Sequence, residues 1–149
     1  MKQYLKKQGS SVLLLLLLTL VSCGEESLTK EEQVTQLLIG KSGTAAKVWK
    51  MQSVDVDGVD QTSIYSGLTI QFSEGQFTAT NGGGIWPASG TWTFSSTDAS
   101  IIKRDDGTEI EVTVTETTLT LKMSWTKTTL GPGRLRSVSG HHVFNFAKA

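Results

Sequence analysis

The feature that most constrains this chain is an alternation of apolar and polar residues that begins at Lys47 and continues towards the C-terminus. Residues 109–114 show it most clearly, because Ile110, Val112 and Val114 are separated by polar residues. Successive side chains of a β-strand point to opposite faces of the sheet, so a period of two predicts strands with one buried face and one solvent face. The sequence therefore predicts an all-β fold for this part of the chain.

We predict eight strands, separated by clusters of turn residues such as Asp57-Gly58. They are expected near residues 47–56, 68–72, 77–79, 92–94, 101–102, 110–114, 119–125 and 134–147, the last with a bulge at Gly140. Short turns between consecutive strands predict a meander, and closing it into an antiparallel up-and-down barrel buries each apolar face and removes the sheet edges. A Greek-key sandwich is the alternative, but it needs long crossover connections.

One short helix is predicted in front of the strands, at residues 30–39. Thr29 and Glu32 have the spacing of a capping box, and Gly40 provides a natural stop. The apolar residues of the segment recur at helical spacing: Val34, Leu37 and Leu38. A helix this short is marginal by itself, so we expect its apolar stripe to plug or flank one end of the barrel.

The start of the chain has the features of a bacterial lipoprotein leader. Lys2, Lys6 and Lys7 form a positively charged beginning, and the apolar run that follows, residues 12–21, is too short to span a membrane. The run ends in LVSC, which resembles a lipobox, the motif in which a lipid is attached to the cysteine, here Cys23. An ordinary signal peptide with an incidental cysteine is the alternative interpretation.

The leader divides the chain into three parts. Residues 1–22 are predicted to be a signal peptide, residues 23–28 the lipidated cysteine and its tether, and residues 29–149 the barrel domain with its N-terminal helix. Because two or more acyl chains give a stable membrane anchor, we expect a lipid-anchored protein of the cell envelope. The expected location is the outer membrane, facing either the periplasm or the cell surface.

Charge argues against one class of partner. The chain has 14 basic and 14 acidic residues, but three of the basic ones lie in the leader and none of the acidic ones does. The remaining chain is therefore acidic and carries no basic stripe. Nucleic-acid binding, which depends on such a stripe, is not expected.

Six segments between Lys47 and Lys148 resemble one family. They are VWKMQSV at 48–54, VDG at 56–58, GLTIQF at 67–72, WPASGTWTF at 86–94, RDDG at 104–107 and VSGHHVFNF at 138–146. Together they are similar to the lipocalin-like domain lipoproteins of the Bacteroidota. The resemblance covers nearly the whole domain and implies an eight-stranded barrel.

The resemblance also implies a role for the first tryptophan of the domain. In lipocalins a Gly-x-Trp motif marks the first strand, and its tryptophan packs at the base of the barrel beneath a basic residue from late in the chain. Trp49 corresponds to that tryptophan, although Lys47 replaces the glycine. Arg134 and Arg136 are the two candidates for the basic residue.

Two hypotheses about ligand binding follow. Eight strands enclose a space that side chains fill or that holds one small ligand. If it is a cavity, the inward side chains would bind a small apolar or amphiphilic molecule: Trp49, Met51, Phe72, Phe77, Trp92, Met123, Trp125 and Phe144. If the barrel is filled, an envelope protein or a glycan would bind at its loops, either at Ile85 and Trp86 or at the predicted hairpin tip, residues 127–136. The same Ile85-Trp86 pair is also expected to fold back as a plug.

Catalytic, metal and cofactor sites are not expected. Residues 55–60 only superficially resemble a calcium loop, since Gly58 is fourth where the loop needs its glycine sixth. His141 and His142 are neighbours on a strand, so they point to opposite faces and do not chelate one ion. No pattern of nucleophile, base and acid is present, and the Asp105-Asp106 pair is interpreted as part of a turn.

Overall fold

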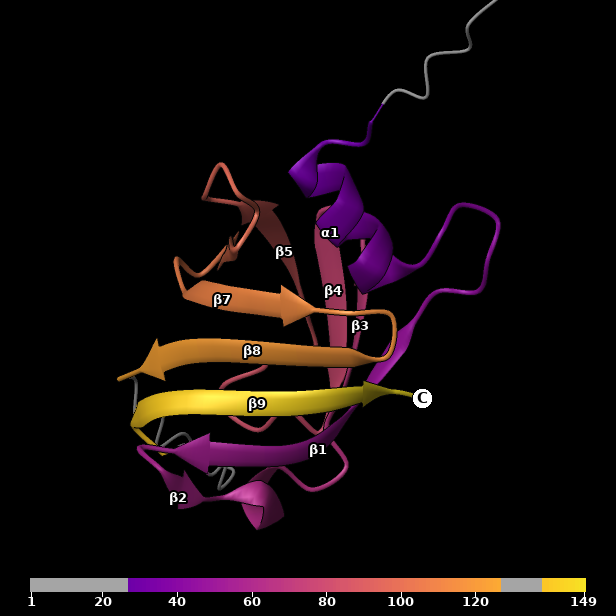
Figure 1. Cartoon of the computed structure of the whole chain (residues 1–149). Helices are drawn as coiled ribbons and strands as arrows, with labels where there is room; N and C mark the ends of the chain where they lie inside the picture. Colours follow the sequence, from indigo (N-terminus) through magenta and orange to yellow (C-terminus); the bar gives the residue numbers. More distant parts are fainter. Residues whose placement is uncertain (1–26, 127–137) are drawn as a thin grey trace, which may run out of the picture.

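The computed structural model describes residues 27–126 and 138–149 (Figure 1). Its helices are α1 (Lys30–Ile39) and a short 3-10 helix, η1 (Thr62–Tyr65). Its strands are β1 (Val48–Val56), β2 (Val59–Asp60), β3 (Thr69–Ser73), β4 (Gln76–Thr80), β5 (Ser89–Phe94), β6 (Ile101–Arg104), β7 (Glu109–Val114), β8 (Thr118–Trp125) and β9 (Gly140–Lys148). Cys23, the predicted signal peptide and the 127–136 tip with both candidate arginines lie outside the described residues.

The strands form one closed antiparallel barrel. From β3 to β9 each strand pairs with the next one along the chain, and β1 pairs with β3 on one side and β9 on the other. This confirms the predicted eight-stranded up-and-down barrel and excludes the Greek-key alternative. β2 is an additional short strand, which the turn at Asp57 and Gly58 folds back onto the end of β1.

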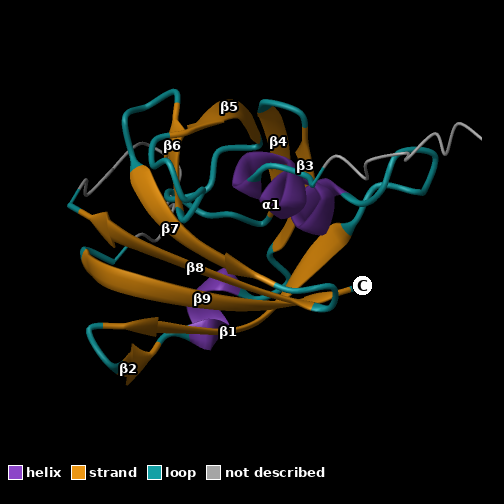
Figure 2. Cartoon of the chain, turned by 45° about the horizontal axis from the view of Figure 1, so that its top comes forward, coloured by secondary structure: helices purple, strands orange, loops and turns teal. Residues whose placement is uncertain are grey.

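Helix α1 has the bounds that its capping pattern predicts. The Thr29 hydroxyl accepts a hydrogen bond from the Glu32 amide at 3.2 Å, and the Glu32 carboxylate accepts one from the Thr29 amide at 2.7 Å. Leu38 is fully buried, and Val34 packs against the barrel core. Figure 2 shows α1 across one opening of the barrel, where it contacts β3 and β7. We call this opening the helix end, and the opposite one the loop end.

The irregularity in the barrel is not where the sequence predicted it. A bulge was expected at Gly140, but the β1–β9 register instead skips Gln52, between Met51 and Ser53 of β1. The buried positions of β1 change from odd to even numbers at this point, which keeps both halves of the long strand facing the core. Gly140 begins β9 at a φ of 144°, where a side chain would overlap the Asp57 carboxylate.

Aromatic side chains fill the interior of the barrel. A continuous series of ring contacts runs from Trp92 through Phe72, Phe77 and Trp86 to Phe144, with neighbouring ring centroids 5.8 to 6.4 Å apart. Each of these side chains is at most 4% exposed. Close packing of this kind is typical of a protein core, in which side chains interdigitate and leave few voids larger than a water molecule.

Candidate functional site

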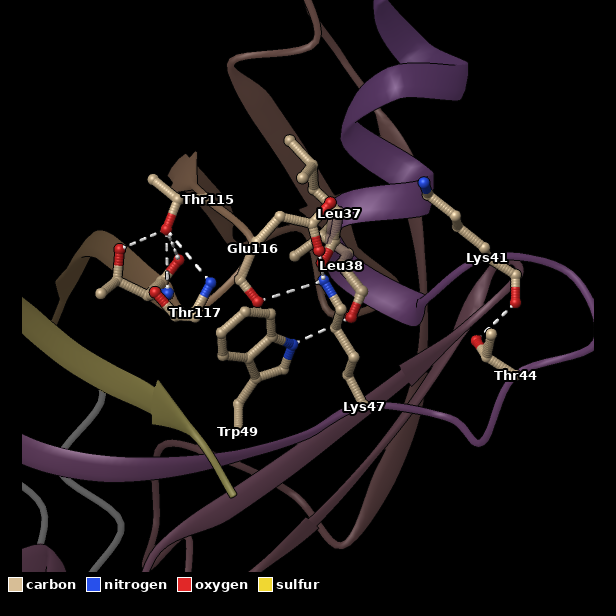
Figure 3. Close-up of polar contacts among 10 residues, drawn as sticks. Leu37, Leu38, Lys41, Thr44, Lys47, Trp49, Thr115, Glu116 and Thr117 are labelled. Atoms are coloured by element: carbon tan, nitrogen blue, oxygen red, sulfur yellow. Dashed lines mark hydrogen bonds and ion pairs between the residues drawn. The ribbon is translucent and has the colours of Figure 1, made fainter.

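The helix end is held closed by a buried lysine. Lys47, just before β1, is 6% exposed, and its Nζ lies 2.9 Å from the Leu37 carbonyl oxygen and 3.0 Å from Glu116 Oε2 (Figure 3). The same ammonium lies 5.6 Å from the centroid of the Trp49 ring. Lys47 therefore joins α1, β1 and the β7–β8 turn in one contact.

Trp49 forms the second connection between the barrel and α1. Its indole Nε1 donates to the Leu38 carbonyl at 2.9 Å (Figure 3). The last carbonyls of a helix have no partner within the helix, and α1 has no basic residue in its last turn. Trp49 on β1 and Lys47, just before β1, supply the missing donors. These two hydrogen bonds position the helix on the barrel.

Trp49 has a cation over its ring in the described part of the chain. Arg134 and Arg136 were the expected candidates, and both lie outside the described residues. Among the described residues the cation over Trp49 is Lys47, which occupies the position of the glycine in the Gly-x-Trp motif. The hydrogen bond and charge of Lys47 lower the pKa of Glu116, so this carboxylate stays ionised beside the ammonium.

A buried arginine occupies the loop end. Arg104, the last residue of β6, is 2% exposed, and its Nη1 donates to the Ile85 carbonyl at 2.8 Å. Its Nε and Nη2 donate to the two oxygens of Asp106 at 3.2 and 2.6 Å. The guanidinium lies 5.1 Å from the Trp86 ring centroid and 5.7 Å from that of Trp125. Asp106, expected to serve only the turn, is thus the counter-ion of a buried charge.

The sequence predictions did not include this arginine, although the sequence around it contains a signal for its burial. Ile102 and Arg104 are separated by two positions, so they share the inward face of a strand. A carboxylate follows two residues later at Asp106, within reach of the same side chain. Burial raises the pKa of Asp106, but hydrogen bonds from Arg104 and Thr108 outweigh that effect and hold the pKa well below its usual value.

The 81–88 loop folds into the loop end as a plug. Ile85 is fully buried and Trp86 is 2% exposed, so the pair does not form the exposed patch on which a glycan or protein was expected to bind. The tight turn requires Gly82, because a Cβ there would overlap the Trp86 backbone. Within the described part of the chain, the Trp86 indole N–H has no hydrogen-bond partner. The Trp86 ring is instead held by its packing against Phe77 and Phe144 and by the Arg104 guanidinium over it.

His142 completes the loop end. Its ring is fully buried and stacks on Phe144, with centroids 5.6 Å apart, whereas His141 is exposed on the opposite face as predicted. The Nδ1 atom lies 3.0 Å from the Gly140 carbonyl and Nε2 lies 3.4 Å from the Tyr65 hydroxyl. In the neutral tautomer Nδ1–H donates and Nε2 accepts, which satisfies both atoms. Burial lowers the pKa of His142 and so favours this neutral form.

Two of the acidic residues considered for metal binding accept hydrogen bonds from backbone amides. Asp57 Oδ1 accepts from the His141 amide at 3.0 Å, and Asp60 Oδ1 accepts from the Thr62 amide at 2.8 Å. Across residues 27–126 and 138–149, no three His, Cys, Asp or Glu side chains gather as a set of metal ligands. In the same ranges no helix is long and apolar enough to cross a membrane.

The eight predicted cavity residues are distributed between the core and two open grooves. Trp49, Met51, Phe77 and Phe144 line neither groove and belong to the packed core. Met123 and Trp125 reach a groove along β7 and β8. The remaining two, Phe72 and Trp92, reach a larger groove beside α1.

The groove beside α1 has a volume of about 910 Å³. One side is formed by α1 and the loop that follows it, and the other by the β3–β4 turn with the end of β5. Its floor is apolar, with Phe72, Trp92, Phe94 and Ile39. Its rim carries charged residues: Glu31, Glu32, Lys41 and Glu74. An apolar floor beneath a charged rim suits a ligand that has both characters.

The chain was compared with protein-family models, with curated proteins and with solved structures, and none of the three comparisons finds a match.

Proposed function

We propose that the protein is a lipid-anchored protein of the cell envelope that binds a small amphiphilic molecule in the groove beside α1. The observation that carries this proposal is the contrast between a filled interior and an open groove. The ring contacts from Trp92 to Phe144 occupy the space that a lipocalin uses for its ligand. The groove has about 910 Å³, within the range of small-molecule sites, and an apolar floor.

The proposed anchor would hold the groove near the membrane. Thr29, at the start of α1, lines the groove and follows Cys23 by six residues. Six extended residues span at most about 20 Å, so a lipid on Cys23 keeps the groove close to the bilayer surface. An amphiphile that leaves the membrane would therefore need to travel about 20 Å or less from the anchor to reach the start of the groove.

The charges on the rim indicate the character of the ligand. Glu31, Glu32 and Glu74 contribute three carboxylates, against one ammonium from Lys41. Opposite charges attract across a partly solvated groove, so a cationic head group is favoured over an anionic one. We therefore expect a single-chain cationic amphiphile to bind more tightly than a fatty acid of equal length.

The groove is tested by titrating the detergent-extracted protein with dodecyltrimethylammonium and with laurate while following tryptophan fluorescence. Trp92 in the groove floor serves as the reporter. Thr35→Phe fills the groove and is expected to weaken binding of the cationic probe at least tenfold. Gln33→Phe places the same ring on α1 outside the groove and should leave binding unchanged. Equal losses in both variants, or tighter binding of laurate, would contradict the proposal.

The anchor is tested separately by metabolic labelling with an alkyne-modified fatty acid. The wild-type protein should take up the label and partition into the membrane fraction. Cys23→Ser should remove both properties while leaving the barrel folded. Label that persists in Cys23→Ser would show that the lipobox interpretation is wrong, whatever the groove binds.

A further inference from the structure

The outer face of β3, β4 and β5 has an unusual composition. These three strands lie side by side (Figure 1), and every outward position carries a hydroxyl or an amide side chain. The nine residues, which we call the neutral face, are Thr69, Gln71, Ser73, Gln76, Thr78, Thr80, Ser89, Thr91 and Thr93. All are exposed except Thr69, which is half-buried. The inward positions of the same strands hold the core.

The strand register arranges the neutral face in rows. Gln71 lies opposite Thr78, and Thr78 lies opposite Ser89. The neighbouring row holds Ser73, Gln76 and Thr91 in the same manner. Neighbouring strands are about 4.8 Å apart and alternate residues about 6.7 Å apart. The neutral face therefore presents closely spaced donors and acceptors over an area of about 10 by 13 Å.

Most of these side chains are free to bind something else. Within the described part of the chain only Ser73 uses its side chain for a hydrogen bond, a long one of 3.4 Å to the Gln76 carbonyl. Threonines elsewhere are engaged, for example Thr115 with Thr118 at 2.7 Å and Thr120 with Asn145 at 3.1 Å. The neutral face thus keeps its hydrogen-bonding capacity for water or a partner.

Charged residues surround this face but do not enter it. Lys50 on β1 lies opposite Thr69, and Lys103 on β6 lies opposite Thr93. On the far side of the barrel, the outer faces of β7 and β8 carry both signs of charge, including the ion pair of Lys122 with Glu111 at 3.7 Å. The absence of charge is therefore a property of three strands and not of the whole surface.

We propose that the neutral face binds an extended, uncharged glycan chain. Hydroxyl groups both donate and accept, and glutamine amides offer one group of each kind, which matches the hydroxyl and acetamido groups of a neutral sugar polymer. An uncharged partner leaves no ion desolvated on either side of such a contact. A charged polymer would have to lose water from its ionised groups without gaining an opposite charge on this face. This site lies on the outside of the barrel, and it borders the groove beside α1, whose lining includes Ser73 and Thr93.

We expect a single protein molecule to bind the glycan weakly, and many copies on one membrane to bind it strongly. Hydrogen bonds to a solvent-exposed face replace bonds to water and gain little individually. Many copies held on one membrane by their lipids would contact the same polymer at several points, which raises the apparent affinity without any new contact. Insoluble glycan particles reproduce this multivalency in an experiment.

The test uses the full chain, extracted in detergent and incorporated into phosphatidylcholine vesicles. The vesicles are sedimented with particles of chitin, cellulose or starch, and the bound fraction is measured. Thr78→Glu places a charge at the centre of the neutral face and is expected to reduce retention on the preferred glycan at least tenfold. Thr113→Glu is the matched control, since Thr113 is an exposed outward threonine of β7 without a described side-chain hydrogen bond. It should keep wild-type retention.

Three results would overturn the proposal. The first is a wild-type protein retained by none of the three glycans. The second is equal retention of Thr78→Glu and wild type, with both folded as judged by near-ultraviolet circular dichroism. The third is retention on alginate, a carboxylated polymer, that exceeds retention on all neutral glycans and disappears in salt, which would assign binding to the bordering lysines. If Thr78→Glu does not fold, Gln71→Glu replaces it at the neighbouring position.

Discussion

The two ends of the barrel are closed by the same type of contact, formed by unrelated residues. At the helix end Lys47 lies over Trp49, pairs with Glu116 and donates to a carbonyl of α1. At the loop end Arg104 lies over Trp86, pairs with a carboxylate and donates to a carbonyl of the 81–88 loop. In each case a buried cation fixes the segment that covers the opening.

The two contacts differ in burial and in distance along the chain. The counter-ion of Arg104 is Asp106, two residues away with a 30% exposed side chain, whereas the counter-ion of Lys47 is Glu116, 69 residues away with a 67% exposed side chain. Water screens an exposed ion pair, and a buried charge that loses its partner is costly. The loop end is therefore expected to depend more on its cation than the helix end does.

The largest effect is expected at the loop end. Arg104→Met removes the buried charge, leaves Asp106 without its main partner and leaves the Ile85 carbonyl without a donor. We expect the free energy of unfolding to fall by about 3 to 5 kcal/mol, measured by urea titration followed by tryptophan fluorescence. Lys103→Met, on the exposed face of the same strand, should change it little. A loss below about 1 kcal/mol would show that Arg104 does not hold the plug.

A smaller effect is expected at the helix end. Lys47→Met leaves the Leu37 carbonyl unpaired, but Glu116 turns to water at little cost. We expect a loss of about 1 to 3 kcal/mol by the same urea titration, with Lys50→Met as the exposed control on β1. If Lys47→Met destabilises the protein as much as Arg104→Met, burial of the counter-ion is not what separates the two ends.

Loss of the cap at the start of α1 should lower the stability of the protein less than loss of Lys47 at the end of the helix. Thr29→Ala removes the hydroxyl that accepts from the Glu32 amide, and loss of such a cap usually costs about 1 kcal/mol. Hydrogen exchange should show faster exchange of amides in α1 and unchanged exchange at the loop end. Thr29→Ser restores the acceptor and should restore protection. Faster exchange spread evenly over the barrel would contradict a local role.

The contributions of the two ends to stability should be lost at different pH values as the solution is acidified. Burial lowers the pKa of His142, so below about pH 6.5 the unfolded chain binds a proton that the folded chain does not, and stability falls as the pH drops. His142→Gln should remove this slope in urea titrations between pH 7 and pH 5. The pKa of Glu116 is also lowered, so the helix end keeps its contribution until the pH falls below the normal glutamate range. A slope that persists in His142→Gln would assign it to another group.

Local patterns predicted the elements well. The capping box of Thr29 and Glu32 and the stop at Gly40 marked both ends of α1, because these signals act within one turn of helix. The period of two located all eight barrel strands, because it reports which face of each strand is buried. The bulge was misplaced, since the skipped residue, Gln52, has no local signal and depends on the pairing of β1 with β9.

The sequence by itself determined an all-β barrel with one capped helix, since periodicity and capping depend on neighbours along the chain. Only the tertiary structure decided which cations lie inside, that Trp86 packs into the core, and that the groove lies beside α1. Those outcomes depend on segments far apart in sequence, such as Lys47 with Glu116, and on how completely side chains fill a closed barrel. Burial and partner are properties of the folded chain, and no single segment carries them.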